Sequence, residues 1–289
     1  MRIYEGGEDF VLAELTEEMS LRSNLVAIAA ARALEARDVA GLVDVYPSNA
    51  CLMVRYDPDI IGYDDTVAVL VAELDAQAAD PALTIDTRVV ELPIWFDDPF
   101  TNECLHRFRS GHQRPEGDDL DFSAEVNGLT RAEFLRRYGA APWFVSSVGF
   151  VAGLPELYQV VDRADQLQVP KYLRPRTDTP PLAVGHGGCF GAIYSVRGGG
   201  GYQLVGIGAA PIFDPAQRLA DFAGSPVLFR TGDLVRYRSL DEAEYQQIQA
   251  AVAEGTFRYR TTPFQFSLAA CEADYPGYAA QIMEAIEHA

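Results

Sequence analysis

The chain has 289 residues, a size at which two domains are expected. Its content of 48% hydrophobic and 22% charged residues is ordinary for a globular protein. The formal net charge of -19 argues against a nucleic acid or an anionic membrane as partner, because both require clustered positive charge.

The cysteines and histidines do not have the spacing of a metal site. They form no CxxC pair and no HxxxH array, so we expect no bound metal. Glu5 and Glu8 interrupt the first residues early, which argues against a signal peptide. The longest apolar helix-like run, 25–34, is too short to span a bilayer. Free thiols without a targeting segment predict a cytoplasmic protein.

The first ninety residues predict a small α+β unit. Four short strands are expected, at residues 1–4, 9–14, 42–47 and 50–56. Apolar residues at helical spacing predict helices over 21–36, with Ser20 as the N-cap, and over 64–79. With the β-rich run that follows, the order strand, helix, strand, strand, helix, strand is that of a ferredoxin-like split βαβ unit, and we assign this α+β domain to residues 1–87.

A second unit begins with a β-rich run at 88–96. The following segment, 101–122, is polar and irregular, with a short helix expected near 104–109. Thr130 and Glu133 have the spacing of a capping box, which predicts the start of another helix.

From residue 143 to 237, short β-rich runs alternate with glycine and proline clusters. This pattern favours a closed or sandwich-like β domain, which we assign to residues 88–240. Helical patterns return at 240–254 and 275–288, so residues 241–289 are predicted to form a C-terminal helical extension.

Lys171 is the only lysine in a chain that has 22 arginines. An exposed surface uses the two residue types almost interchangeably, whereas a site that needs a compact ammonium with a tunable pKa does not. The alternative is that a GC-rich genome replaced lysine elsewhere and one remained by chance.

Nine glycines fall within the 22 residues 185–206. Glycine lets a backbone approach a ligand closely and expose its N–H groups to an anion. A P-loop is excluded because no lysine follows the glycines. The segment therefore predicts either tight turns of a β domain or an anion- or carbonyl-binding surface, and a nucleotide site is disfavoured.

Five motifs occur in a fixed order along the chain. They are FDDP at 96–99, VNGL at 126–129, KYLRPRTDTP at 171–180, AVGHGG at 183–188 and GGYQLVG at 200–206. Together they resemble one half of the carboxyltransferase domain of urea carboxylase, the half also called allophanate hydrolase subunit 1. More distant likenesses are the B subunit of 5-oxoprolinase and its sporulation-kinase-inhibitor relative.

The resemblance implies an α+β fold in which a cyclophilin-like β-barrel follows the N-terminal domain. It also implies an activity, the transfer of a carboxyl group from carboxybiotin to a nitrogen of urea or a related amide. A chain with one lysine lacks the Met-Lys-Met that accepts biotin. Biotin is therefore expected on a separate chain, and ATP is expected to be used by a partner subunit. The expected partners are a homologous second carboxyltransferase half and a biotin carboxylase/carrier chain.

The resemblance assigns roles to two cations. Lys171 is expected to be catalytic, by stabilising charge or transferring a proton. Arg176 is expected to hold a carboxylate, with an internal ion pair to Asp178 as the alternative. Asn127 is expected either to contact the substrate or to adopt the left-handed conformation before Gly128.

The remaining predicted substrate-binding residues lie in the glycine-rich segment. His186 is expected to be a proton carrier or a satisfied turn residue, and Gly187 and Gly188 offer backbone groups. Tyr202 and Gln203 follow the glycines, and the Gln203 amide is expected either to bind an amide carbonyl or to be a plain strand position.

One departure concerns the segment after Gln203. The family commonly has an arginine where this chain has Ile207-Gly208, so the identity of the acceptor substrate stays open. Two alternative functions also stay open. One is a subunit of an ATP-dependent lactam or amide hydrolase of the 5-oxoprolinase type, and the other is a non-catalytic binding protein like the kinase inhibitor.

Overall fold

The structure, a computed structural model, describes residues 1–287. It contains two compact units, Met1–Thr87 with Gln265–Asp274, and Arg88–Phe264 with the chain from Tyr275 onward. The segment predicted as one C-terminal extension is therefore divided between the units, and the predicted domain boundaries stay a proposal. His288, the predicted end of the last helix, lies outside the described residues.

The first unit contains an antiparallel sheet with strand order β1-β2-β4-β3. Its elements are β1 (Arg2–Gly6), β2 (Phe10–Glu14), α1 (Leu21–Arg37), β3 (Leu42–Ser48), β4 (Cys51–Tyr56), α2 (Tyr63–Ala78) and α7 (Leu268–Ala273). Alternate residues of β2 and β4 are buried, as expected for a sheet with one covered face. The Ser20 hydroxyl accepts a hydrogen bond from the Ser23 amide, so the predicted N-cap is confirmed.

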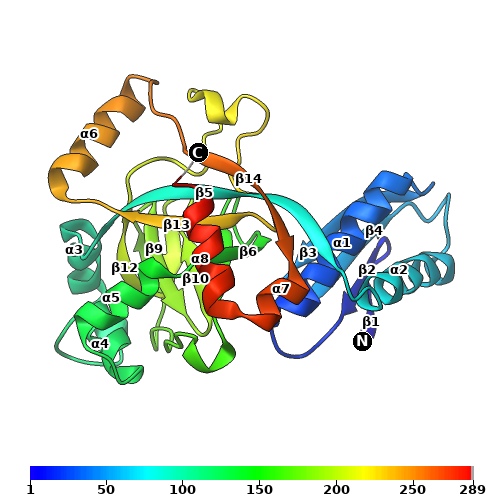
Figure 1. The fold of residues 1–289 in the computed structure, drawn as a ribbon, viewed down its shortest axis with the longest axis horizontal. Helices are drawn as coiled ribbons and strands as arrows, with labels where there is room; N and C mark the ends of the chain where they lie inside the picture. The colour runs from blue at the N-terminus through cyan, green and yellow to red at the C-terminus, as the bar shows by residue number, and fades with distance from the viewer. Residues whose placement is uncertain (288–289) are drawn as a thin grey trace. The chain divides into compact units, whose positions relative to one another are not determined.

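The second unit is built around a closed barrel of seven strands (Figure 1). They are β5 (Thr84–Phe96), β6 (Trp143–Val148), β7 (Pro155–Gln159), β9 (Ala183–Gly187), β10 (Phe190–Ile193), β12 (Gln203–Gly208) and β13 (Leu234–Ser239). The strands follow the order β12-β9-β10-β7-β6-β13-β5, and β5 pairs again with β12 to close the barrel. The predicted α+β fold class with a closed β-barrel is confirmed.

Shorter elements and helices complete this unit. They are α3 (Pro99–Phe108), α4 (Asp119–Val126), α5 (Arg131–Ala140), β8 (Arg176–Thr179), β11 (Gly198–Gly200), α6 (Glu242–Ala253), β14 (Thr261–Ser267) and α8 (Tyr275–Ala285). Strands β8 and β11 form a separate two-stranded sheet. Helices α3 and α4 pack against β12, and α5 packs against α4 and β13 (Figure 1).

Helix α4 corrects the prediction of an irregular segment at 101–122. Its eight residues are too few to show a helical stripe in the sequence. The helix begins because the Asp118 carboxylate accepts a hydrogen bond of 2.7 Å from the Asp121 amide. Helix α3 starts earlier than predicted, at Pro99, because the Asp98 carboxylate caps the Phe100 amide.

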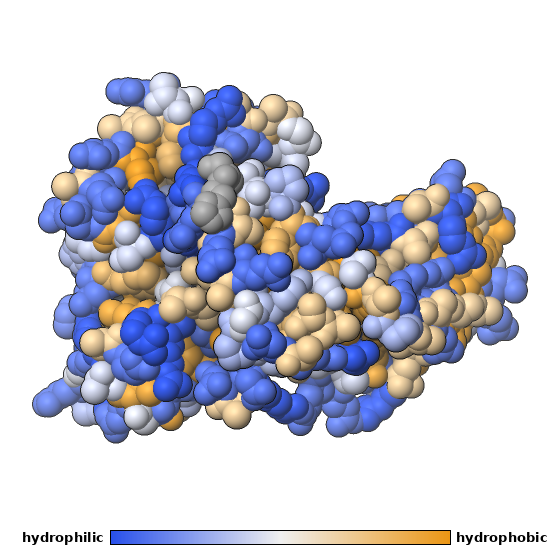
Figure 2. Space-filling view, in the orientation of Figure 1, coloured by the Kyte–Doolittle hydropathy of each residue, from blue (hydrophilic) through white to orange (hydrophobic). Residues whose placement is uncertain are grey.

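An aromatic cluster fills the barrel. The Tyr138 ring lies 4.6 Å from the Trp143 ring and 5.6 Å from the Tyr237 ring, measured between centroids. The Trp143 indole N–H donates to the Tyr138 carbonyl, so this buried polar atom is satisfied. Hydrophilic side chains are spread over the face drawn in Figure 2, in keeping with the strongly acidic composition. In the part of the chain that is described, no helix combines the length and apolarity needed to cross a membrane.

The second unit also contains an ion pair between the partly buried Arg88 and the buried Asp233, and its loss should be measurable. The Arg88 guanidinium donates to both carboxylate oxygens of Asp233, which is 2% exposed, and to the Leu228 carbonyl. We expect Arg88→Met to lower the free energy of unfolding by about 3 kcal/mol, because the Asp233 charge stays buried without its partner. The matched control Arg136→Met breaks an exposed pair with Glu133 and should cost less than about 1 kcal/mol. Chemical denaturation measures both, and equal losses would contradict the account.

Candidate functional site

A pocket of about 560 Å³ lies beside the two-stranded sheet of β8 and β11. Most of its lining is apolar or aromatic, and a stretch of four glycines, 198–201, forms part of its wall. The charged residues that line it are Lys171, Arg176 and Glu156. Its volume falls within the range of small-molecule sites.

Lys171 reaches this pocket with an ammonium group that is available to a ligand. Its Nζ lies 5.0 Å from the centroid of the Tyr202 ring, a cation–π contact. Within residues 1–287, no group accepts a hydrogen bond from Nζ, and the side chain is exposed. The three N–H donors can therefore serve a bound molecule.

Arg176 is the second cation of the pocket, and it is only 1% exposed. Its partners are all neutral. The guanidinium donates to the Tyr202 carbonyl at 2.8 Å, to the Thr179 hydroxyl at 3.2 Å and to the Tyr194 hydroxyl at 3.4 Å. It also lies 4.5 Å above the Tyr172 ring. Among the described residues, Arg176 forms no ion pair.

The alternative predicted for Arg176, an ion pair with Asp178, is wrong. Asp178 instead pairs with Arg197 at 2.6 Å and with Arg107 at 3.2 Å. A buried guanidinium without a carboxylate partner is costly, and an anionic group of a ligand would compensate that cost. Arg176 therefore gives the pocket wall a group that can bind a carboxylate, although the acidic Glu156 lines the same pocket.

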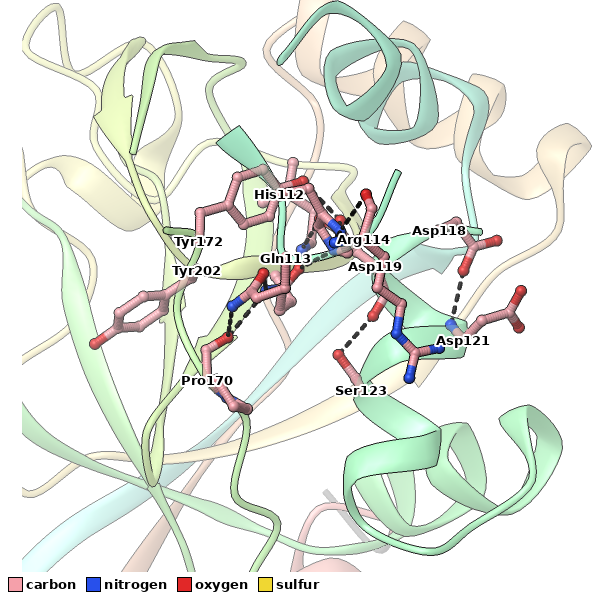
Figure 3. A network of polar contacts seen from close by, with 12 residues as sticks. His112, Gln113, Arg114, Asp118, Asp119, Asp121, Ser123, Pro170, Tyr172 and Tyr202 are labelled. Carbon is pink, nitrogen blue, oxygen red and sulfur yellow. Dashed lines mark hydrogen bonds and ion pairs between the residues drawn. The ribbon is translucent and has the colours of Figure 1, made fainter. Parts of the chain in front are cut away.

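Behind the pocket lies a buried carboxylate, Asp119, at the start of α4 (Figure 3). It accepts hydrogen bonds from the Tyr172 hydroxyl at 2.6 Å and from the Leu204 amide at 2.7 Å. Burial raises the pKa of Asp119, and these two donors, together with the nearby charge of Arg176, oppose that effect. Tyr172 therefore stands between the Asp119 carboxylate and the Arg176 guanidinium, with its hydroxyl on one and its ring against the other.

A chain of polar contacts leads from Asp119 to the backbone at Lys171. His112 Nε2 lies 3.5 Å from an Asp119 oxygen and 3.1 Å from Gln203 Oε1. The Gln203 amide nitrogen donates to the Pro170 carbonyl at 2.9 Å and to Gln113 Oε1 at 3.1 Å. Gln113 in turn donates to the Lys171 carbonyl. The network fixes the backbone from which the Lys171 side chain extends, while the Tyr202 ring points away from it (Figure 3).

Two predicted contact residues have their amides engaged elsewhere. Gln203 is buried in this network and does not line the pocket. Asn127 exchanges hydrogen bonds of 3.0 Å with the backbone of Gln168 in both directions. The left-handed conformation expected at Asn127 belongs to Gly128, since φ is -95° at Asn127 and +68° at the glycine. Asn127 thus anchors the segment ahead of Lys171.

His186 is enclosed by the barrel and does not line the pocket. Its Nε2 lies 3.1 Å from the carbonyls of both Leu167 and Gly188, so Nε2 carries the proton. Its Nδ1 has no hydrogen-bond partner among residues 1–287. Burial lowers the pKa of His186 to about 4, which keeps the ring neutral near pH 7.

Neither Gly187 nor Gly188 lines the pocket, but Gly187 leaves room for the Tyr202 ring, which does. A Cβ atom at position 187 would lie 2.4 Å from the Tyr202 ring, so only glycine lets the ring lie there. Gly188 has a φ of +63° and exchanges backbone hydrogen bonds with Val169. Of the predicted site residues, the structure thus brings Lys171, Arg176 and Tyr202 together at the pocket.

Sequence reasoning missed His112, Gln113, Asp119, Tyr172 and Tyr194. Tyr172 follows Lys171 in a quoted motif, which was an available signal. His112 and Gln113 stand in a segment without periodicity, and only the fold brings them to Gln203. In the described part of the chain, no group of three or more His, Cys, Asp or Glu side chains is placed to hold a metal ion.

Comparison with known proteins decides the family. A model of the carboxyltransferase domain, subdomains C and D, matches residues 1–222. The chain belongs to this carboxyltransferase-domain family. The likeness to urea carboxylase and to the B subunit of 5-oxoprolinase predicted from the sequence is thereby confirmed.

Relatives of this carboxyltransferase-domain chain differ in length. The B subunit of the Bacillus subtilis 5-oxoprolinase is 24% identical over 84% of the chain and 95% of its own length. The urea amidolyase of Saccharomyces cerevisiae is 25% identical over 88% of the chain, which spans only 14% of that protein. The crystal structure of the Kluyveromyces lactis urea carboxylase has the same fold, with a TM-score of 0.81 and 23% identity over 99% of the chain and 25% of its own.

Ile207, which stands where the resemblance leads us to expect an arginine, lies away from the pocket of this carboxyltransferase-domain chain. The Ile207 side chain packs in a cluster with Leu240 and Tyr245, with Trp95 against it. It is not among the lining residues. An arginine at this position, as expected from the resemblance, would therefore start outside the pocket lining.

The neutral state of His186 predicts a pH dependence of stability. The unfolded imidazole has its usual pKa of about 6.5, so below that pH the unfolded chain binds a proton that the folded chain does not. Unfolding is thus favoured as the pH falls. Between pH 7 and pH 5, we expect this group to lower the free energy of unfolding by about 2 kcal/mol.

Denaturation of the wild type and of His186→Gln at both pH values measures this effect. All other titrating groups are common to the two proteins, so the difference between their pH slopes isolates His186. Parallel slopes would show that the imidazole is not kept neutral in the folded state.

Proposed function

We propose that this chain is one subunit of a split carboxyltransferase that moves a carboxyl group from biotin, carried on another chain, to a nitrogen of urea or a related amide. The observation that carries the proposal is the pair of cations in one pocket. Lys171 has an ammonium without a hydrogen-bond acceptor in the described chain, and Arg176 has a buried guanidinium without an ion pair.

The pocket suits a biotin ring with an anionic group. Its wall is mainly apolar and aromatic, and its two cations suit a carboxylate and a ureido oxygen. When bound, biotin supplies a carboxyl group attached to a ureido nitrogen. Arg176 would hold a carboxylate through charge-assisted hydrogen bonds, and the Lys171 N–H donors would stabilise negative charge on an oxygen.

Partner chains are part of this proposal. The chain spans a small part of the urea amidolyase that it resembles. We infer that a homologous second half and a biotin carboxylase/carrier chain complete the enzyme, and that ATP is used by a partner. The acceptor enters as a small amide or urea-like molecule.

A second candidate function is supported by one specific observation. The chain matches the B subunit of the Bacillus subtilis 5-oxoprolinase over 95% of that protein's length. A component of an ATP-dependent lactam hydrolase would use the same two cations, with Arg176 on a substrate carboxylate and Lys171 on a carbonyl oxygen. Biotin would have no part in that reaction.

Replacement of Lys171 tests the catalytic assignment. We expect Lys171→Arg and Lys171→Met each to lower the turnover of the assembled enzyme by about 100-fold or more. A guanidinium keeps the charge but not the compact geometry of the ammonium. Co-purification with the partner chains should be unchanged. The exposed substitution Arg136→Lys serves as the control, and wild-type turnover by Lys171→Arg would refute a lysine-specific role.

The composition of the native complex separates the two candidate functions. We expect the tagged chain to co-purify with a biotinylated polypeptide that labelled streptavidin detects. A biotin-free complex that hydrolyses 5-oxoproline with ATP would replace the first candidate by the second.

A further inference from the structure

Phe150 combines three properties that stability alone does not explain. Its side chain is 85% exposed, its backbone φ is +66°, and it lines the pocket that contains Lys171. The left-handed conformation is strained for a residue with a large side chain. Exposure of an aromatic ring to water is a further cost.

The loop around Phe150 is held rigidly enough to impose this conformation. It connects β6 to β7 and is closed by a hydrogen bond of 3.0 Å from the Gly149 amide to the Leu154 carbonyl. The Ser195 hydroxyl donates to the Ala152 carbonyl at 2.6 Å, which ties the loop to the strand region opposite. At Gly153, φ is +72°, so the turn has glycine at its other left-handed position. Phenylalanine at position 150 therefore stands where glycine would be less strained.

We propose that Phe150 is a ligand-binding residue whose ring covers one face of a five-membered cyclic amide in the pocket. This inference rests on the proposed function of the pocket and names the class of ring that it takes. The Tyr202 ring, with Lys171 near it, and the Tyr194 ring supply further aromatic wall. The flat face of a cyclic amide stacks on an aromatic ring, while its carbonyl oxygen accepts from a cation.

Urea alone does not account for this wall. It is small and polar, and it would leave most of a cavity of about 560 Å³ empty. Urea would bury little of the apolar area of the exposed Phe150 ring, so their contact would contribute little binding free energy. A ring with an amide group uses both the apolar lining and the two cations, Lys171 and Arg176.

Two ligands share this chemistry, the ureido ring of biotin and the lactam ring of 5-oxoproline. Both contain a planar C(=O)–NH unit within a five-membered ring. The pocket chemistry described above suits either one. The experiment therefore includes a probe for each source.

Ligand-detected saturation-transfer NMR on the full chain measures the dissociation constants of biotinamide, 5-oxo-L-proline and urea. We expect at least one ring probe to bind the wild type more tightly than urea does. In Phe150→Gly and Phe150→Ala, the dissociation constant of that probe should rise about fivefold to tenfold, from the loss of one aromatic contact. The melting temperature of Phe150→Gly should equal or exceed that of the wild type, because glycine relieves the strain.

The control is Ile60→Ala, which removes an exposed apolar side chain that does not line the pocket. It should leave every dissociation constant unchanged. An effect on biotinamide alone identifies the ureido ring as the ligand, and an effect on 5-oxo-L-proline alone identifies the lactam.

Three results would overturn the inference: unchanged ring binding in both Phe150 variants, equal binding of urea and the ring probes, or no binding of either ring by the wild type. None of these depends on turnover. If Lys171→Arg kept its activity while the Phe150 variants lost ring binding, the proposed catalytic role would fail and the ring site would stand.

Discussion

The pocket depends on a buried positive charge, Arg176, that forms no ion pair among the described residues, although the Asp119 carboxylate lies close enough to interact with it electrostatically. The Arg176 guanidinium rests on the Tyr172 ring and donates only to uncharged oxygens. The buried carboxylate behind it, Asp119, contacts the hydroxyl of the same tyrosine. Such an arrangement keeps the guanidinium in place and leaves its charge available to an anion, which explains why a mostly apolar pocket can suit a carboxylate. The assignment of the pocket to carboxyl or amide chemistry follows from this charge.

The second cation, Lys171, is positioned by contacts of its backbone and by the cation–π contact of its ammonium with the Tyr202 ring. Gln203 and Gln113 hold the carbonyls of Pro170 and Lys171, and Asn127 holds the residues just before them. These amides come from elements far apart in sequence. They fix where the Lys171 side chain starts and, within the described chain, leave its ammonium without an acceptor. Because the backbone at Lys171 is held in place, its flexible side chain extends from a fixed position.

The sequence predicted the fold more completely than the site. Periodicity and the Ser20 cap indicated the helices of the first unit. Glycine-separated β runs indicated a closed or sandwich-like β domain, and the family resemblance implied a barrel. Of the predicted site residues, Lys171, Arg176 and Tyr202 line the pocket, and all three stand in local sequence motifs. Asp119 was missed because the short helix that it begins shows no apolar periodicity in the sequence. His112 was missed because it lies in a non-periodic segment ahead of that helix. His186 was predicted to contact the substrate because it lies in a glycine-rich motif, but its side chain is enclosed by the barrel.

The charge of Arg176 provides the most direct test of this account. Calorimetric titration with 5-oxo-L-proline and with its carboxamide compares a carboxylate with a neutral group of nearly the same shape. We expect the wild type to bind the carboxylate at least about tenfold more tightly, and Arg176→Gln to lose this preference, since a charged hydrogen bond contributes about 1.5–3 kcal/mol. Equal affinity of the wild type for the two compounds, or an unchanged preference in the variant, would contradict the central claim.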